Sequence, residues 1–377
     1  MHRRSPILSL LAVCSLAGLL HLAACSGSSG DGVSNVPGGV NNTGGAGASS
    51  AGAPASAGAA LTAGAPSAGA GGAPTTPTAG AAGAVTAGAG GADTSAGGTA
   101  GAAMSGGGAN GTHPTGPSAG CGKTFADPFV TAVEHDMTVK VDAEFTAKYA
   151  SRKYYTQLPK SYDGMKPLPV VFYGQGCGQS GPESSGFSDV MNTDGFLLVQ
   201  MIPIGGCYEA GKSGSLNSPD GPYFDQALSE VEANYCIDKS KVYVAGWSSG
   251  AWISTYLACT RGGVIRAAAT VAGGLQHAHP TCVGGAGIIM YIGNGDNENG
   301  VVDMVNGFDV GTGQSRDTFI KTNGCSATST AWDAAFPTCQ IYGGCDNPVI
   351  WCPVDGGHGA GNDKLPSAAW KFWGSLK

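Results

Sequence analysis

The chain has 377 residues, of which 65 are glycine, and a formal net charge of −7. Glycine occurs at more than twice its usual share of about 7%, but it keeps no three-residue period, so a collagen is excluded. The basic residues form no stripe, which argues against a nucleic-acid-binding protein.

The first 25 residues are typical of an export signal. Arg3 and Arg4 form a short basic start, residues 7–22 are mainly apolar, and the sequence Leu-Ala-Ala-Cys ends at Cys25. The apolar run is shorter than the roughly 20 residues of a membrane-spanning helix. Small residues before a cysteine resemble a bacterial lipoprotein signal, which implies that Cys25 is lipidated and that Ser26 favours the outer membrane. A plain secretory signal is the alternative.

Residues 26–120 predict a disordered tether. They hold 28 of the glycines, no aromatic residue and two charged residues, Asp31 and Asp93. Such a segment cannot bury enough apolar surface to offset the entropy of ordering it. A flexible coil of this length reaches roughly 50–60 Å. The folded body is therefore predicted to be one domain, residues 121–377.

The cysteines favour an oxidising compartment. Ten lie beyond Cys25, and an even count in an exported domain predicts five disulfides of undetermined pairing. No two of them have the Cys-x-x-Cys spacing of a metal site, so we expect no metal.

Strands alternating with helices are expected in the folded region. Short apolar runs cover residues 168–173, 196–201, 241–246 and 287–292. Runs that are apolar on both faces suit a parallel sheet with helices on both sides. Apolar residues from Phe224 to Tyr235 recur at helical spacing between the second and third runs. The expected fold is therefore a three-layer α/β domain with a mainly parallel central sheet.

A Gly-x-Ser-x-Gly motif, Gly246 to Gly250, follows the third run and precedes a helical segment. A serine on a tight strand-to-helix turn is exposed above the sheet, and the glycines let neighbouring chain pass closely. Ser248 is therefore the predicted nucleophile, and the backbone N–H of Ser249 a predicted oxyanion donor. A helix N-cap role for Ser248, or Ser249 as nucleophile, is the alternative.

A serine nucleophile needs a base, and His358 is the predicted one, because it follows a late apolar run and lies in a glycine-rich loop. His135 precedes the serine, and the pair His277 and His279 comes one strand too early. That pair could suggest a metal, but no third ligand is evident.

The base needs a carboxylate that orients it, and Asp296, just past the fourth apolar run, is the predicted residue. Asp303 is the runner-up, and Asp355 is too close in sequence to His358 to reach it well. The spacing Asp296-Asn-Glu298 resembles part of a calcium loop, but the rest of that pattern is missing. A second oxyanion donor is expected in the glycine-rich loop 173–181, with Gln175 favoured and Cys177 next.

These blocks together resemble the polyhydroxybutyrate-depolymerase-type esterases, a group that includes feruloyl and acetylxylan esterases of carbohydrate esterase family 1. The resemblance covers about residues 150–375 and rests on residues 167–180, 235–248, 293–296 and 356–358. It implies an α/β-hydrolase fold, no cofactor, and hydrolysis of esters on plant polysaccharide or of a polyester. It also implies the disulfides Cys325–Cys345 and Cys339–Cys352.

Three positions depart from the pattern of that group. Tyr173 stands where histidine is usual, Gln175-Gly176 look inserted, and Gly-Ala-Gly follows His358 in place of Trp-Pro. Substrate preference and the second oxyanion donor therefore do not transfer from the resemblance.

The combined prediction is an exported, lipid-tethered, monomeric serine esterase that uses Ser248, His358 and Asp296 through an acyl-enzyme. Carbohydrate-linked esters (feruloyl or acetyl-xylan) are favoured over a polyester such as polyhydroxybutyrate. A serine peptidase would share the triad, and a non-catalytic binding module on the same fold is the alternative of another class. The predicted partners are the ester substrate and a membrane reached only through the lipid on Cys25.

Overall fold

The computed structural model describes residues 113–145, 147–183, 185–210, 217–276, 282–299 and 311–376. The predicted signal with Cys25 and most of the predicted tether lie outside these ranges. So do Asp303, His277 and His279. In the described part of the chain no helix is both long and apolar enough to span a membrane.

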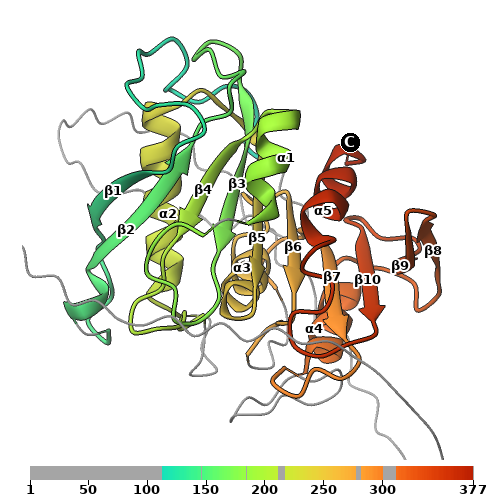
Figure 1. Cartoon of the computed structure of the whole chain (residues 1–377). Coiled ribbons are helices and arrows are strands. Elements are labelled where there is room, and N and C mark those ends of the chain that lie inside the picture. The colour runs from blue at the N-terminus through green and yellow to red at the C-terminus, as the bar shows by residue number, and fades with distance from the viewer. Residues whose placement is uncertain are drawn as a thin grey trace, which may run out of the picture. The chain divides into compact units, whose positions relative to one another are not determined.

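A ten-stranded mixed sheet forms the centre of the molecule (Figure 1). Its six middle strands are parallel, in the order β4-β3-β5-β6-β7-β10. They are β3 (Leu168–Gly174), β4 (Leu197–Met201), β5 (Ile237–Trp247), β6 (Ala267–Val271), β7 (Gly287–Gly293) and β10 (Val349–Val354).

Antiparallel strands extend the sheet at both edges. β1 (Val133–Thr138) and β2 (Ser151–Gln157) lie beside β4, and β9 (Phe336–Tyr342) and β8 (Ser329–Asp333) lie beside β10. A short 3₁₀ helix, Ala147–Tyr149, precedes β2. The four predicted central strands are confirmed, whereas the sequence analysis did not predict β6, β10 or the edge strands.

Helices cover both faces of the sheet. α1 (Gly186–Asp194) and α5 (Leu365–Gly374) pack on one face. α2 (Asp220–Asn234), α3 (Ser249–Thr260) and α4 (Thr312–Thr322) pack on the other. The predicted three-layer α/β class is thereby confirmed, and the strand order with its helices is that of an α/β-hydrolase.

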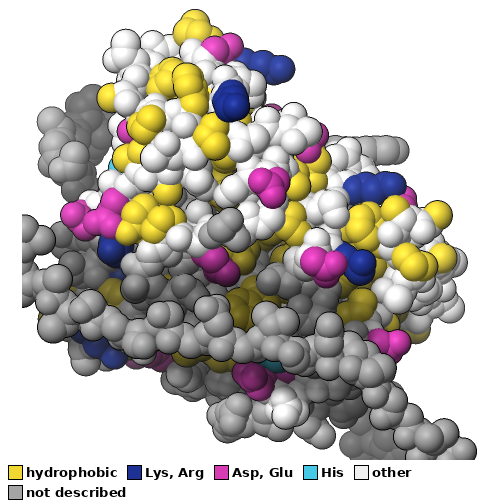
Figure 2. Space-filling view, in the orientation of Figure 1, with side chains coloured by type: hydrophobic (Ala, Val, Ile, Leu, Met, Phe, Trp, Pro, Cys, Tyr) yellow, Lys and Arg dark blue, Asp and Glu magenta, His cyan; other side chains and the backbone are white. Residues whose placement is uncertain are grey.

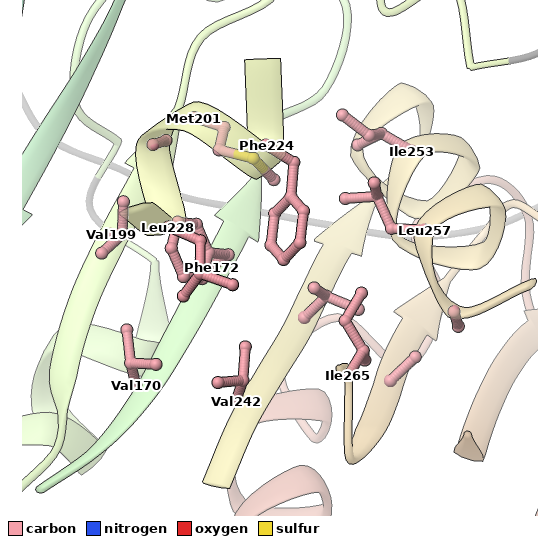
Figure 3. Close-up of a cluster of buried hydrophobic side chains, with 14 of the residues drawn as sticks. Val170, Phe172, Val199, Met201, Phe224, Leu228, Val242, Ile253, Leu257 and Ile265 are labelled. Carbon is pink, nitrogen blue, oxygen red and sulfur yellow. The ribbon is translucent and has the colours of Figure 1, made fainter. Parts of the chain in front are cut away.

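The core beneath α2 and α3 shows why the sequence folds this way (Figure 3). Phe224 and Leu228 project from α2 and Ile253 and Leu257 from α3 onto the buried apolar side chains of the sheet. The sheet side chains in this layer include Val170, Phe172, Val199, Met201 and Val242. A helical spacing of three and four residues on one partner, against an apolar strand on the other, gives this close packing.

The packed body reaches further toward the N-terminus than residue 121. The backbone N–H of Ser118 donates to the carbonyl of Ile237 at 2.9 Å, and Pro117 bridges to Asp238.

On the face shown in Figure 2, acidic, basic and apolar side chains are interspersed among uncharged ones.

Five disulfides join all ten cysteines of this body. The pairs are Cys121–Cys236, Cys177–Cys207, Cys259–Cys282, Cys325–Cys345 and Cys339–Cys352. The last two are the pairs that the family resemblance implied. Five disulfides are typical of a protein exported to an oxidising compartment.

Candidate active site

Ser248 lies on a sharp turn between β5 and α3. Its backbone has φ 55° and ψ −120°, a conformation that costs energy for a residue with a side chain. The turn is tight because the chain touches itself: a Cβ on Gly246 would come within 2.1 Å of the Gly250 carbonyl oxygen. The strained strand-to-helix turn predicted from the motif is therefore present.

A continuous chain of hydrogen bonds joins the three predicted catalytic residues. His358 Nε2 lies 3.0 Å from Ser248 Oγ, and His358 Nδ1 lies 3.1 Å from Asp296 Oδ2. The three residues come from loops after β5, β7 and β10, which are parallel, so their carboxyl ends meet at one edge of the sheet. This is the order and geometry in which a histidine can remove the proton of a serine hydroxyl.

Asp296 is held as a buried carboxylate. Its Oδ1 accepts hydrogen bonds from the backbone N–H groups of Glu298 at 2.9 Å and Asn299 at 3.0 Å. Burial acts to raise the pKa of Asp296, but the hydrogen bonds from His358 and from these two backbone groups outweigh it and lower the pKa. The carboxylate therefore stays charged at neutral pH and can stabilise a protonated His358.

The pKa of His358 is raised above its ordinary value. The hydrogen bond to Asp296 is the largest cause, burial acts against it, and the charges of Asp296 and Glu298 add to it. Glu298 Oε2 lies 3.6 Å from His358 Nε2, the same nitrogen that faces Ser248. A second carboxylate thus increases the basicity of this imidazole.

Asn299 is a site residue that the sequence analysis missed. Its Nδ2 lies 3.3 Å from His358 Nδ1, and its Oδ1 accepts a hydrogen bond from the Trp252 indole at 2.8 Å. Because the indole fixes the amide orientation, the Asn299 amide group lies against the histidine ring. Its place in the same loop as Asp296 was the available signal.

The loop after β3 lies directly against the turn that carries Ser248. A Cβ on Gly250 would come within 1.8 Å of the Gly174 carbonyl oxygen and 2.9 Å of the Gln175 nitrogen. The Gln175 side chain turns away and donates to Gln200 Oε1 at 3.0 Å, and Gln200 donates to Gln157 at 3.1 Å. These amides anchor the loop to the neighbouring strands.

Gln175 and Cys177 both remain candidates for the second oxyanion donor. The backbone of Gln175 also makes a hydrogen bond that acts to lower the pKa of Tyr208, although burial leaves that pKa raised. The Gln175 N–H group that makes this bond is the one that would bind the oxyanion, so Tyr208 and the oxyanion compete for it. Cys177 is held by its disulfide to Cys207, in the loop after β4. The Ser249 side-chain hydroxyl donates to the Gln175 carbonyl at 3.2 Å, whereas the hydroxyl that lies beside His358 is that of Ser248.

The remaining described candidates have other hydrogen-bond partners. His135 is in β1 and hydrogen-bonds Thr156 at 2.8 Å, while Asp355 accepts from Asn294 at 3.3 Å. Within the described ranges, no group of three or more His, Cys, Asp and Glu side chains could hold a metal ion.

The fold is that of an α/β-hydrolase, and Ser248, His358 and Asp296 lie in a hydrogen-bonded series at the carboxyl ends of its parallel strands. The chain is 28% identical over 242 residues to feruloyl esterase C of Emericella nidulans, covering 59% of this chain and 83% of that protein. It is 26% identical to feruloyl esterase D of Neurospora crassa, covering 68% and 90%. A poly(3-hydroxyalkanoate) depolymerase C of Paucimonas lemoignei is 29% identical over 161 residues, covering 40% and 38%. These relatives support a carboxylic ester hydrolase.

Solved structures are similar at a lower level. An acetyl xylan esterase from Aspergillus awamori has a TM-score of 0.45 and 16% identity, over 64% of this chain and 99% of that one. A ferulic acid esterase from Anaeromyces mucronatus has a TM-score of 0.40 and 16% identity, over 70% and 96%. No protein-family model matches the chain.

Proposed function

We propose that the chain is an exported serine esterase that hydrolyses carbohydrate-linked esters through an acyl-enzyme. The observation that carries this proposal is the hydrogen-bonded series Ser248, His358 and Asp296 at a strained strand-to-helix turn. A serine in that setting is activated by its histidine neighbour and presented above the sheet.

In the proposed reaction, His358 Nε2 takes the hydroxyl proton as Ser248 Oγ bonds to the ester carbonyl carbon. The backbone N–H of Ser249, at the start of α3, and one from the loop holding Gln175 and Cys177 bind the resulting oxyanion. His358 then gives its proton to the leaving alcohol, and the acyl group stays on Ser248. A water molecule then bonds to the acyl carbon as His358 takes its proton. The bond between that carbon and Ser248 Oγ breaks, the acid leaves, and His358 returns the proton to Ser248 Oγ. Asp296 stays ionised and stabilises the imidazolium in both halves.

The substrate class is proposed from the relatives. Two of them are named feruloyl esterases and align along most of their length, which favours an ester between an aromatic acid and a sugar. The depolymerase from Paucimonas lemoignei supports a polyester as the second candidate.

An ester panel tests the proposal. Feruloylated arabinoxylan, acetylated xylan, polyhydroxybutyrate and a short nitrophenyl ester would each be offered to the wild type and to Ser248→Ala. We expect hydrolysis of the sugar esters and a loss of about 10⁴-fold or more in Ser248→Ala, with unchanged melting. A Ser248→Ala variant that kept a tenth of the wild-type rate would rule out this nucleophile. Preference for polyhydroxybutyrate would select the second candidate.

A lipid anchor at Cys25 is the proposed means of attachment, and it rests on the Leu-Ala-Ala-Cys sequence. Stable anchoring needs more than one acyl chain, each buried methylene contributing about 0.8 kcal/mol. Cys25→Ser should shift esterase activity out of the membrane fraction or block processing. Wild-type activity found wholly in the medium, with no lipid on the mature N-terminus, would contradict the anchor.

A further inference from the structure

A cavity of about 290 Å³ lies at the same edge of the sheet as the proposed catalytic site. Tyr173, at the end of β3, and the first residues of α1 form one wall, and Asn362 and Asp363, just before α5, form the other. In Figure 1 the C-terminal end of α5 lies opposite the arrowhead of β10, so the beginning of α5 lies at the edge that carries Ser248. The small volume suits one ring-sized unit.

Two polar side chains of the first wall have no hydrogen-bond partner. Glu183 is half-buried, and its Oε2 is buried without a hydrogen bond. Tyr173 is only 2% exposed, and its hydroxyl makes no hydrogen bond to another described residue. Burial and the charge of Glu183 both raise the pKa of Tyr173, so the carboxylate is close to this hydroxyl. Buried polar groups without partners cost stability, and a ligand that supplies hydrogen bonds removes that cost.

Ser185 adds a third polar group to the same wall. It is the N-cap residue of α1, a position where a serine side chain usually accepts a hydrogen bond from a backbone N–H of the first turn. Ser185 makes no such bond, and its Oγ is buried without a partner. This hydroxyl is therefore available to a ligand in the cavity.

The charges around the cavity favour an uncharged ligand that carries several hydroxyl groups. None of the described residues that line it is a lysine, arginine or histidine, so none of them would pair with an anion. Asp363 is 78% exposed and pairs with Lys364 at 3.8 Å. The Glu183 carboxylate accepts hydrogen bonds through two oxygens, whereas the hydroxyls of Tyr173 and Ser185 donate and accept. Neighbouring hydroxyls on a sugar ring match this combination.

A metal ion is the other ligand that would satisfy an unpaired carboxylate. Calcium takes about six to eight oxygen ligands, usually with several carboxylates among them. Within the described ranges, no three His, Cys, Asp and Glu side chains lie together as a metal-binding group. Hydroxyl donors are therefore favoured over a cation.

We propose that this cavity is a subsite for a neutral sugar unit of the polysaccharide substrate. Two adjacent sugar hydroxyls would donate to the Glu183 carboxylate, and further hydroxyls would meet those of Tyr173 and Ser185. The inference rests on the proposed function, because the proposed substrate supplies the sugar. Such a subsite would hold the sugar chain at the edge of the sheet where Ser248 cleaves the ester.

Binding to the full chain carrying Ser248→Ala tests the subsite, because that variant removes turnover. The probes are an arabinoxylan oligosaccharide without ester groups, its fully O-methylated form, and calcium chloride, followed by titration calorimetry and saturation-transfer NMR. We expect binding of the unmethylated oligosaccharide alone. Adding Glu183→Gln should weaken it about tenfold or more, since charge-assisted hydrogen bonds are lost. Adding Tyr173→Phe should weaken it by a smaller factor.

Thermal melting separates a binding role of Glu183 from a structural one. Burial raises the pKa of Glu183, so the charged carboxylate is unfavourable in the folded protein. Glu183→Gln should therefore melt no lower than its parent while binding more weakly, whereas a carboxylate that held the fold together would lower melting when replaced. Asp189→Asn is the matched control, because Asp189 is an exposed acid in the first turn of α1 that does not line the cavity, and it should leave binding unchanged.

Equal binding of the O-methylated probe, or oligosaccharide binding unaffected by Glu183→Gln, would overturn the proposal. Calcium bound with the same dependence on Glu183 would overturn it in favour of a cation site. Binding is measured without turnover, so a failed ester panel would contradict the proposed function while leaving the measured sugar binding intact. Absent sugar binding with a successful panel would contradict the subsite alone.

Discussion

Gly250→Ala should inactivate the enzyme even though alanine is the better helix former. Gly250 is in the first turn of α3, where the substitution would ordinarily stabilise the helix by about 0.5–1 kcal/mol. Here the added Cβ would come within 1.8 Å of the Gly174 carbonyl oxygen and 2.2 Å of its carbon. Both are backbone atoms, so the loop after β3 must move by more than 1 Å to restore an ordinary contact.

That loop is the proposed source of the second oxyanion donor, and a misplacement of 1 Å can cost about 10²-fold in rate. We therefore expect kcat/KM for a short nitrophenyl ester to fall by about 10²-fold or more. Gly181→Ala, in the same loop, is the control, because its Cβ would meet no atom within 4 Å. A folded Gly250→Ala enzyme, checked by circular dichroism, that retained more than half of the wild-type kcat/KM would refute this reasoning.

Three further predictions concern the histidine and the disulfides. Asp296→Asn should lower kcat by about 10⁴-fold, because the amide cannot stabilise the imidazolium; near-normal turnover would assign the acid elsewhere. Activity requires a neutral His358 and is lost as pH falls through its raised pKa. Glu298→Gln removes one of the charges that raise this pKa, so the acidic limb of the pH–rate profile should move to lower pH, and an unchanged limb would contradict the electrostatic argument. Full reduction should abolish activity, since each disulfide contributes about 2–4 kcal/mol; active enzyme with ten titratable thiols would exclude this.

Much of the central sheet could be predicted because its strands are continuous apolar runs. The run at residues 287–292 became β7 almost residue for residue. β6 was not predicted because its sequence, Ala-Ala-Ala-Thr-Val, is equally compatible with a helix. β8 was not predicted because it is largely exposed and its sequence shows no regular alternation of apolar residues. The local pattern of apolar residues identifies strands that are buried on both faces. It does not identify a strand that forms only because its backbone pairs with a neighbouring strand.

The three predicted catalytic residues could be placed because chain order and strand ends determine which loops meet. Asn299 could not be predicted, because its amide is held by the indole of Trp252. Trp252 lies 47 residues earlier in the chain. The same holds for Gln200, which meets Gln175 only because β3 and β4 are neighbours. Contacts between side chains from segments far apart in the chain have no signature in a single sequence.

The disulfide Cys177–Cys207 has a consequence for where the protein can work. It joins the loop after β3 to the loop after β4, beside the proposed oxyanion site. Before the proposed export, in a reducing cytoplasm, these two loops would lack their covalent link, and the rim of the site would be incompletely constrained. Under that proposal the bond forms after the chain has crossed the membrane, and oxidation then completes the covalent frame of the site. The precursor would therefore lack one constraint on the site while it is still inside the cell that makes it.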